Sequence, residues 1–452
     1  MTAIAVRARR VALPDAGATV ALLVVVGAGV FVALAAAAGD DAYLVPALVR
    51  ARAGWLPGPL AGVSVATSLG DVFFAVAVMT VGYAAVVALA PRLTLRRVLV
   101  AVAVLDAVFL LAPPLFSTDV FNYVDVAQLT GRFGLDPYVA APAAGPHTGL
   151  YVFLHWRHAV TVYGPLFTVL ARLLGHATVS QAVLAFKACA AAAAFGCTVL
   201  VAWIAGRRGA SPARAAAAFG LNPLVLVWTV GGAHNDALMV LGLLGGVALM
   251  TAGTAAPART GPPDAGAAPR AVDAPATGAA LVVAGAAVKL SAGLALPFLV
   301  WGAGRGRRLR ALAGAAGAAA IVVALAYVAF PDHAGGMLSG LQRQQGLDSI
   351  ASVPTEVALA LGLPGVTALE TTVIHILLAL WLGTCGVLLL RGGDAVALAG
   401  WALLGVVMAS TWLLPWYLVW PLALAAAAAD RRLLIATCAV GAAYVIGHVP
   451  LT

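Results

Sequence analysis

The sequence predicts an all-α polytopic membrane protein. Its mean hydropathy is +1.02, and only 10% of its 452 residues are charged, whereas a soluble domain carries roughly a quarter. Apolar runs of about 20 residues, the length that crosses a bilayer as a helix, recur along the chain. This pattern excludes a series of soluble domains.

The basic residues set the orientation of these runs. A net charge of +9 would suit nucleic acid, but the arginines form short clusters between apolar segments, as they do on the cytoplasmic loops of membrane proteins. We therefore expect no nucleic-acid partner. The four cysteines lie inside apolar runs without CxxC or metal-ligand spacing, so they are expected to be small core residues.

About thirteen transmembrane helices are expected, with the N-terminus in the cytoplasm. The stretch 278–303 is taken as two short helices broken at "VKLSAGLALP", because one helix would place Lys289 in mid-bilayer and the following arginines on the wrong side. Most arginines then lie on the cytoplasmic side, as the positive-inside rule requires. The other segments are expected near residues 18–38, 68–90, 97–115, 181–205, 213–231, 236–252, 311–330, 369–391, 394–411, 413–429 and 432–450.

The segments form two modules. The N-terminal transmembrane module, residues 1–252, contains a long extracytoplasmic loop at 116–180 with interfacial helices. A Pro/Ala/Gly-rich cytoplasmic linker at 253–277 leads to the C-terminal module, residues 278–452, whose outer loop is 331–368. Most carboxylates fall on the outer side, so the outer loops are where a site is expected.

The first outer loop opens with "FSTDVFNYVDVAQLTGRFGLDPY", which places three aspartates directly after an apolar run. Asp119 has two compatible interpretations. It is an N-cap that accepts backbone N–H bonds from an interfacial helix, or a catalytic carboxylate whose pKa is tuned by apolar surroundings.

"VGGAHNDAL" interrupts two apolar segments with His234, Asn235 and Asp236 in a row. A tight turn would need only the glycines and the asparagine, so the added titratable groups favour a function at the outer surface. One His and one Asp are a weak basis for a metal site. Lys289, at the predicted helix break, is interpreted as a contact for an anionic group, with snorkelling to the interface as the alternative.

Other polar and aromatic residues receive structural interpretations. Lys187 is expected to snorkel or to be paired internally, and Asp106 is expected to be a buried hydrogen-bonding partner. "TVYGPLF", which contains Tyr163, and "STWLLPWYLVWPLALA" are rich in aromatic residues and proline. They fit an interfacial aromatic belt, and more weakly a groove for a lipid chain or a sugar ring.

Five stretches, taken together, resemble one family. "FSTDVFNYVDVAQLTGRFGLDPY", "YGPL", "NPLVLVWTVGGAHNDALM", "AVKLSAGLALPFLVW" and "TWLLPWYLVWPLALA" occur in the order seen in actinobacterial polyprenol-phosphate-mannose-dependent alpha-1,6-mannosyltransferases, membrane glycosyltransferases of the GT-C class. The resemblance spans roughly residues 20–450. It implies a GT-C-like helical bundle in the plasma membrane, with its active site on the extracytoplasmic face.

The resemblance also implies a reaction. The donor would be polyprenyl-phosphate mannose and the acceptor a mannan or lipoglycan, with Asp119 as the general base of an inverting transfer that needs no metal and no cofactor. Asp125 lies six residues on and need not share the site of Asp119, which puts a two-acid mechanism in doubt. The expected donor-phosphate contacts are Lys289, His234 and Arg343, and the expected substrate contacts are Tyr123, Asp125, Tyr163, Asn235 and Asp236.

Two alternatives remain at this point. The same scaffold could use another polyprenyl-phosphate sugar, arabinose or glucose, and a lipid or solute transporter would also have many helices with broken segments. Transporters are usually built from repeated halves with sites near mid-bilayer. The sequence contains no evident repeat and its acids gather at the outer face, which favours the enzyme.

Overall fold

The structure is a computed structural model that describes residues 15–39, 41–49, 51, 53–252, 273–333, 335–344, 347–349 and 352–447. All regular elements in these ranges are helices. The α-helices are α1 Ala16–Ala38, α2 Leu69–Leu89, α3 Leu95–Leu111, α4 Asp119–Gly131, α5 Pro165–Ala171, α6 Val179–Arg207, α7 Pro212–Gly220, α8 Asp236–Ala252, α9 Ala274–Ala286, α10 Leu296–Gly302, α11 Arg305–Ala329, α12 Gly336–Gln344, α13 Val353–Ala360, α14 Ala368–Leu390, α15 Ala395–Ala409, α16 Val419–Ala428 and α17 Arg431–Gly447. Short helical segments include the π-helix η7 Leu224–Val230 and the 3-10 helices η8 Leu290–Ala295 and η9 Pro415–Leu418.

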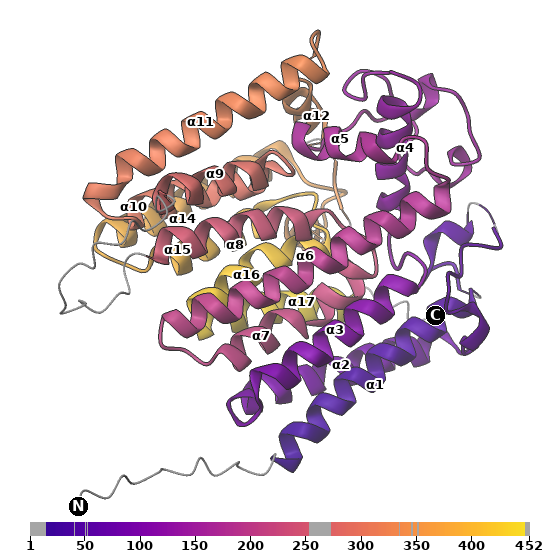
Figure 1. Cartoon of the computed structure of the whole chain (residues 1–452), viewed down its shortest axis with the longest axis horizontal. Helices are drawn as coiled ribbons and strands as arrows, with labels where there is room; N and C mark the ends of the chain where they lie inside the picture. Colours follow the sequence, from indigo (N-terminus) through magenta and orange to yellow (C-terminus); the bar gives the residue numbers. More distant parts are fainter. Residues whose placement is uncertain are drawn as a thin grey trace, which may run out of the picture.

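The long helices form two layers. In the front layer α1, α3, α6, α8, α9 and α11 lie in a row, each packed against the next (Figure 1). A second set, α2, α7, α16, α15 and α14, packs in the same way from neighbour to neighbour. Helices α4 and α5, from the first long loop, gather at one end of the bundle (Figure 1).

Each predicted apolar segment coincides with helical structure. The segment 213–231 is bent by 45° between α7 and η7. The predicted break in 278–303 is present, because α9 ends at Ala286 and α10 starts at Leu296. Helix starts follow ordinary capping chemistry, for example the capping boxes of Ser68 with Asp71 on α2 and of Thr178 with Gln181 on α6.

The number of membrane crossings is a separate question. Within the described ranges, five helices are long and apolar enough to cross a bilayer: α1, α2, α6, α11 and α14, or six spans if the bent pair α7–η7 counts as one. Several other apolar helices, such as α8, α15 and α16, have 10–17 residues. The protein therefore has the apolar helices of a membrane protein, and the count of thirteen stays a prediction.

The two predicted modules meet along glycines of α8 and α9. A Cβ on Gly242 would lie 3.0 Å from the Cα of Gly285, and a Cβ on Gly246 would lie 2.6 Å from the carbonyl oxygen of Gly278. Only glycine allows backbones to approach this closely, as in tightly packed membrane helices. Residues 253–272 of the predicted linker lie outside the described residues, and α9 begins at Ala274.

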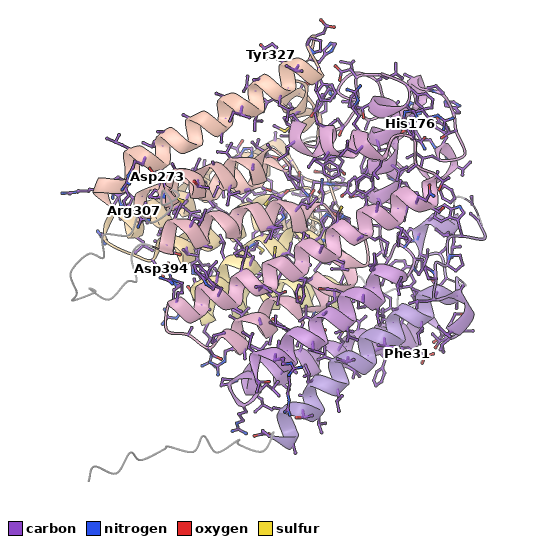
Figure 2. The ribbon with its side chains drawn as sticks, in the orientation of Figure 1. Phe31, His176, Asp273, Arg307, Tyr327 and Asp394 are labelled. Carbon is purple, nitrogen blue, oxygen red and sulfur yellow. The ribbon has the colours of Figure 1, made fainter. Side chains whose placement is uncertain are left out.

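Residues predicted on the cytoplasmic side and residues predicted on the outer side lie at opposite ends of the bundle. Figure 2 shows Asp273, Arg307 and Asp394 at one end and His176 and Tyr327 at the opposite end. At the first end, Asp394 pairs with Arg208 and Asp273 pairs with Arg310. This separation matches the arginine pattern from which the sidedness was predicted.

Lys187, on α6, is paired internally. Its side chain is 2% exposed, and its Nζ donates hydrogen bonds to the carbonyl oxygens of Gly231 at 2.7 Å and Pro113 at 3.3 Å. The ammonium therefore ties α6 to the chain before α4 and to the chain before α8. Asp106 is also buried, but its carboxylate has no hydrogen-bond partner among the described residues, so its predicted role as a bonding partner is wrong.

We expect Lys187→Met to lower the midpoint of thermal unfolding in detergent. Each hydrogen bond from a charged donor contributes about 1.5–3 kcal/mol, and the substitution removes both. Leu184→Ala, at an exposed position of the same helix, is the control. Equal midpoints for the two variants would contradict a stabilising role for Lys187.

Candidate active site

Asp119 is the first residue of α4. Its backbone N–H donates to the Oγ of Ser117 at 3.1 Å, and the chain turns into the helix at Phe116, whose φ is +52°. The N-cap is Thr118, without a side-chain cap bond, so the prediction that Asp119 is the cap is wrong. The carboxylate is thus free to face the neighbouring segments.

His234 lies against this carboxylate. Its Nδ1 is 3.7 Å from an Oδ of Asp119, its side chain is fully buried, and its ring is stacked on Trp416 with centroids 3.5 Å apart. Burial, reinforced by the charge of Lys289, lowers the pKa of the His234 imidazole well below its usual range. The ring is therefore neutral beside Asp119. The ring is enclosed by protein, and its position on the outer side of the membrane stays a prediction.

Asp236 and Lys289 form an ion pair next to His234. The ammonium donates to both carboxylate oxygens of Asp236, at 2.9 and 3.0 Å, and the indole N–H of Trp420 donates to the same carboxylate at 2.6 Å. The ammonium also lies 4.3 Å from the ring centroid of Tyr417 and 5.2 Å from that of Trp420. Asp236 is 1% exposed, so its charge is balanced by Lys289 and the indole.

The "YGPL" motif holds the backbone that carries Lys289. Gly164 N–H donates to the carbonyl of Val288 at 3.0 Å, and Leu166 N–H donates to the carbonyl of Ala287 at 3.1 Å. A Cβ on Gly164 would lie 2.0 Å from the Ala287 oxygen, so this position requires glycine. The first loop and the α9 break are thereby joined through main-chain hydrogen bonds.

The buried Tyr123 and the partly buried Tyr163 connect α4 to these segments. The hydroxyl of Tyr123 accepts a hydrogen bond from the backbone N–H of Asn235 at 3.5 Å, and its ring packs edge-on against Tyr163 with centroids 5.0 Å apart. Burial raises the pKa of both phenols well above the usual range, and the Asp119 charge adds to the effect. Both phenols are therefore neutral at physiological pH.

The environment of Asp119 suits a proton acceptor. Burial raises the pKa of its carboxyl to about 6, while the charge of Lys289 and a hydrogen bond from Trp156 lower it and the charge of Asp236 raises it. Its side chain keeps 19% of its surface exposed. The group is thus ionised near neutral pH but close to its pKa, which is the condition for general-base catalysis.

Two predicted site residues lie apart from this cluster. Asp125 is six residues from Asp119 on α4, so the two side chains point about 120° apart around the helix, and burial raises the pKa of the Asp125 carboxyl to about 7. Arg343 lies exposed on α12, and the described residues give it no ion pair or hydrogen bond. Their assigned roles stay predictions.

Four aromatic site residues were not identified from the sequence. Trp416, Tyr417 and Trp420 come from the segment that was interpreted mainly as an aromatic belt, and Trp156 comes from the first loop. One signal in the sequence could have identified two of them. Trp416 and Trp420 are four residues apart, a spacing that places side chains on one helical face.

No group of three or more His, Cys, Asp or Glu side chains converges as a metal site would require within the part of the chain that is described. The independence from metal that the sequence suggests stays a prediction.

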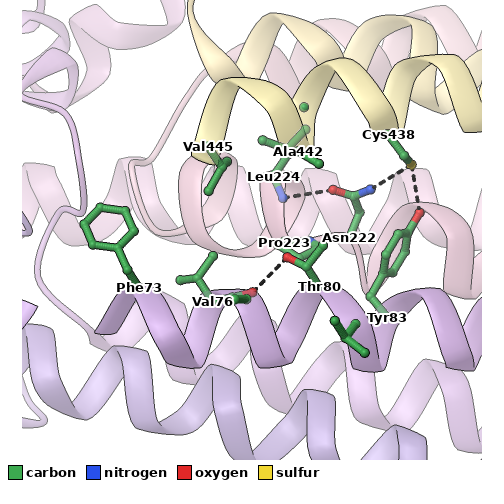
Figure 3. A pocket seen from close by; sticks show the side chains of 13 residues that line it. Phe73, Val76, Thr80, Tyr83, Asn222, Pro223, Leu224, Cys438, Ala442 and Val445 are labelled. Atoms are coloured by element: carbon green, nitrogen blue, oxygen red, sulfur yellow. Dashed lines mark hydrogen bonds between the residues drawn. The ribbon is translucent and has the colours of Figure 1, made fainter. Parts of the chain in front are cut away.

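A separate cavity of about 220 Å³ lies between α2, η7 and α17 (Figure 3). Its walls are mostly apolar. At one end the Tyr83 hydroxyl and the Asn222 amide contact the thiol of Cys438, at 3.5 and 3.7 Å (Figure 3). At the other end the ring of Phe73 lies 6.3 Å from that of Phe116, just before α4. One end of this apolar space thus lies at a residue whose ring contacts Phe116, three residues before Asp119 in the sequence.

Comparison with known proteins places the chain in a family. The family model described as "Alpha-(1->6)-mannopyranosyltransferase, N-terminal domain" matches residues 15–305. The chain belongs to this family. Alpha-(1->6)-mannopyranosyltransferase A of Mycobacterium tuberculosis is 31% identical over 363 residues, which cover 74% of this chain and 65% of the relative.

Further relatives agree with this assignment. A second alpha-(1->6)-mannopyranosyltransferase of M. tuberculosis is 31% identical over 383 residues, covering 71% of this chain and 64% of the relative. A probable alpha-(1->6)-mannopyranosyltransferase of Mycolicibacterium smegmatis is 29% identical over 370 residues, covering 71% and 63%. The matches thus span slightly less than two thirds of each relative. No solved structure matches the chain.

We expect Lys289→Met to lower the midpoint of thermal unfolding, because breaking a buried ion pair leaves the Asp236 carboxylate without its counter-ion, at a cost of about 3–5 kcal/mol. Adding Asp236→Asn should restore most of the loss. The control is Arg92→Met, which removes the partner of Asp15 at an exposed pair and should change little. Additive losses in the double variant would contradict the pairing.

Proposed function

We propose that the protein is an inverting mannosyltransferase that moves mannose from polyprenyl-phosphate mannose to a mannan or lipoglycan acceptor and forms an alpha-1,6 linkage. The activities for which its relatives are named support the mannosyl transfer and the linkage. The observation that carries the proposal is the Asp119 carboxylate, partly exposed and with a pKa of about 6, beside a buried neutral histidine and a lysine.

The chemistry follows from these groups. Asp119 takes the proton of an acceptor hydroxyl while that oxygen attacks the anomeric carbon of the donor mannose. The bond from this carbon to the phosphate oxygen breaks, and polyprenyl phosphate leaves with the electron pair. Attack opposite to a beta-linked phosphate gives an alpha linkage in one step. The nearby carboxylate also stabilises the oxocarbenium-like transition state.

Lys289 is the proposed contact of the departing phosphate. An ammonium has three N–H donors, and two of them bind Asp236. The remaining donor can bind a phosphate oxygen without breaking the pair. His234 lies within 3.7 Å of Asp119 and is a second candidate, while Arg343 would have to approach from α12.

The apolar cavity supports a lipid-linked donor. It extends along α2 from Phe73 to Tyr83, and ten residues of helix correspond to about 15 Å. Phe73 is in ring contact with Phe116, three residues before the proposed base. A prenyl chain in this space would run into the bundle from a phosphate group near Asp119.

We expect Asp119→Asn to reduce the rate of mannose transfer by about 10²–10⁴-fold, the usual contribution of a general base. In the unmodified protein the rate should rise with pH through about 6, because the base acts only after it loses its proton. Transfer of radiolabelled mannose from polyprenyl-phosphate mannose is the measurement. The control is Asp332→Asn in an exposed loop, and full activity of Asp119→Asn would remove the assignment.

We expect the site to face the outside of the plasma membrane. With the four native cysteines replaced, a cysteine introduced at His147 should react with a membrane-impermeant maleimide in intact cells, and one at Arg391 should not. Both positions are exposed. The opposite labelling pattern would overturn the proposed sidedness.

A further inference from the structure

Unpartnered polar atoms gather around Asp119. Among the described residues, half of the buried side-chain nitrogen and oxygen atoms without a hydrogen-bond partner belong to Asn122, His234 and Asn235. Asn122 is 9% exposed, Asn235 is 3% exposed and His234 is fully buried. Buried polar groups are nearly always bonded, so this concentration calls for an explanation.

Asn122 shares a helix face with Asp119. At 3.6 residues per turn, Asn122 and Tyr123 lie about 60° and 40° to either side of Asp119 around α4. The Tyr123 hydroxyl accepts a hydrogen bond from the backbone N–H of Asn235. Asp119 and Tyr123 therefore face the chain at His234–Asp236, and Asn122 flanks Asp119 on the side away from Tyr123.

The unpartnered groups are all neutral. An unsatisfied buried polar group costs about 1–3 kcal/mol, and an amide side chain brings two N–H donors and a carbonyl acceptor. A sugar hydroxyl is a donor and an acceptor at once, so it matches an amide. An anion would instead need a cation among its contacts, and neither the two amides nor the neutral imidazole of His234 supplies one.

We propose that Asn122 and Asn235 form a hexopyranosyl-binding subsite beside Asp119, in which their amides hydrogen-bond the ring hydroxyls of a mannosyl unit. This inference rests on the proposed function and deepens it. The mannosyl unit belongs either to the donor or to the acceptor, since both present the same hydroxyls. The amides of Asn122 and Asn235 accept no proton in the reaction. Both asparagines are therefore specificity-determining residues.

The test uses mannosyl compounds that lack one hydroxyl at a time. In one arm, the 2-, 3-, 4- and 6-deoxy analogues of polyprenyl-phosphate mannose are compared with the parent donor. In the other arm, deoxy analogues of an alpha-1,6-linked mannoside acceptor are compared with the parent acceptor; the hydroxyl that is glycosylated is left in place. The measured quantity is the ratio of kcat/KM for the parent to kcat/KM for the analogue.

We expect the unmodified protein to discriminate by on the order of 10-fold or more against at least one deoxy analogue, because a site built to bond a hydroxyl rejects a ligand without it. In Asn122→Ala or Asn235→Ala the same ratio should fall toward one. The arm in which it falls identifies the donor or the acceptor as the bound unit. A structural defect alone would lower the rates of parent and analogue equally and leave the ratio unchanged.

Asn222→Ala is the matched control. Asn222 is as buried as Asn235, but its amide is already partnered by Leu224 N–H and the thiol of Cys438 (Figure 3), so the ratio should stay at its original value. Asn122→Asp and Asn235→Asp keep the side-chain shape and replace the alanine variants if those do not fold. Unchanged ratios for both asparagines in both arms would overturn the subsite and mean that the amides hold only water.

Failure of the proposed function would look different. In that case the unmodified protein would transfer no mannose from the parent donor to any mannoside. The subsite is then tested by binding alone. The measurement is the rise in the midpoint of thermal unfolding when methyl alpha-mannoside is added. A rise that is lost in Asn122→Ala and Asn235→Ala supports the subsite, and no rise in the unmodified protein overturns it.

Discussion

The buried carboxylate of Asp236 is the constraint on which the site depends. Its charge is stable in the bundle only because Lys289 and Trp420 reach it. These partners come from the α9–α10 break and from α16, so one carboxylate holds together three segments that are distant in sequence. Lys289 is in turn placed by the backbone bonds of Gly164, which brings the first loop into the same assembly.

The electrostatics of Asp119 follow from this arrangement. Burial disfavours its charged form, and the Lys289 ammonium favours it. The Lys289 ammonium also pairs with Asp236. It therefore lowers the pKa of Asp119 only in part, and the Asp119 carboxylate remains a base. The neutral His234 beside Asp119 adds no competing charge. A carboxylate with a pKa near 6 is thus the outcome of opposing effects, and no single neighbour sets it.

Much of the fold, and less of the site, could be predicted from the sequence. The lengths of the apolar runs were enough to predict where the helices lie. The free-energy cost of a lysine in mid-bilayer predicted the break before Lys289. The sequence could not show which helix faces meet, because hydropathy is nearly uniform around these helices. Trp416 and Trp420 were therefore assigned to a belt, and the stacking of Trp416 on the buried His234 ring was not predicted.

The order in which the segments are synthesised gives this architecture one more consequence. Trp420 follows Asp236 by 184 residues, and the family match ends at residue 305, well before it. While the chain is still emerging from the ribosome, the acid that organises the site lacks its indole donor. The partners of the Asp236 carboxylate are therefore complete only once α16 has been synthesised.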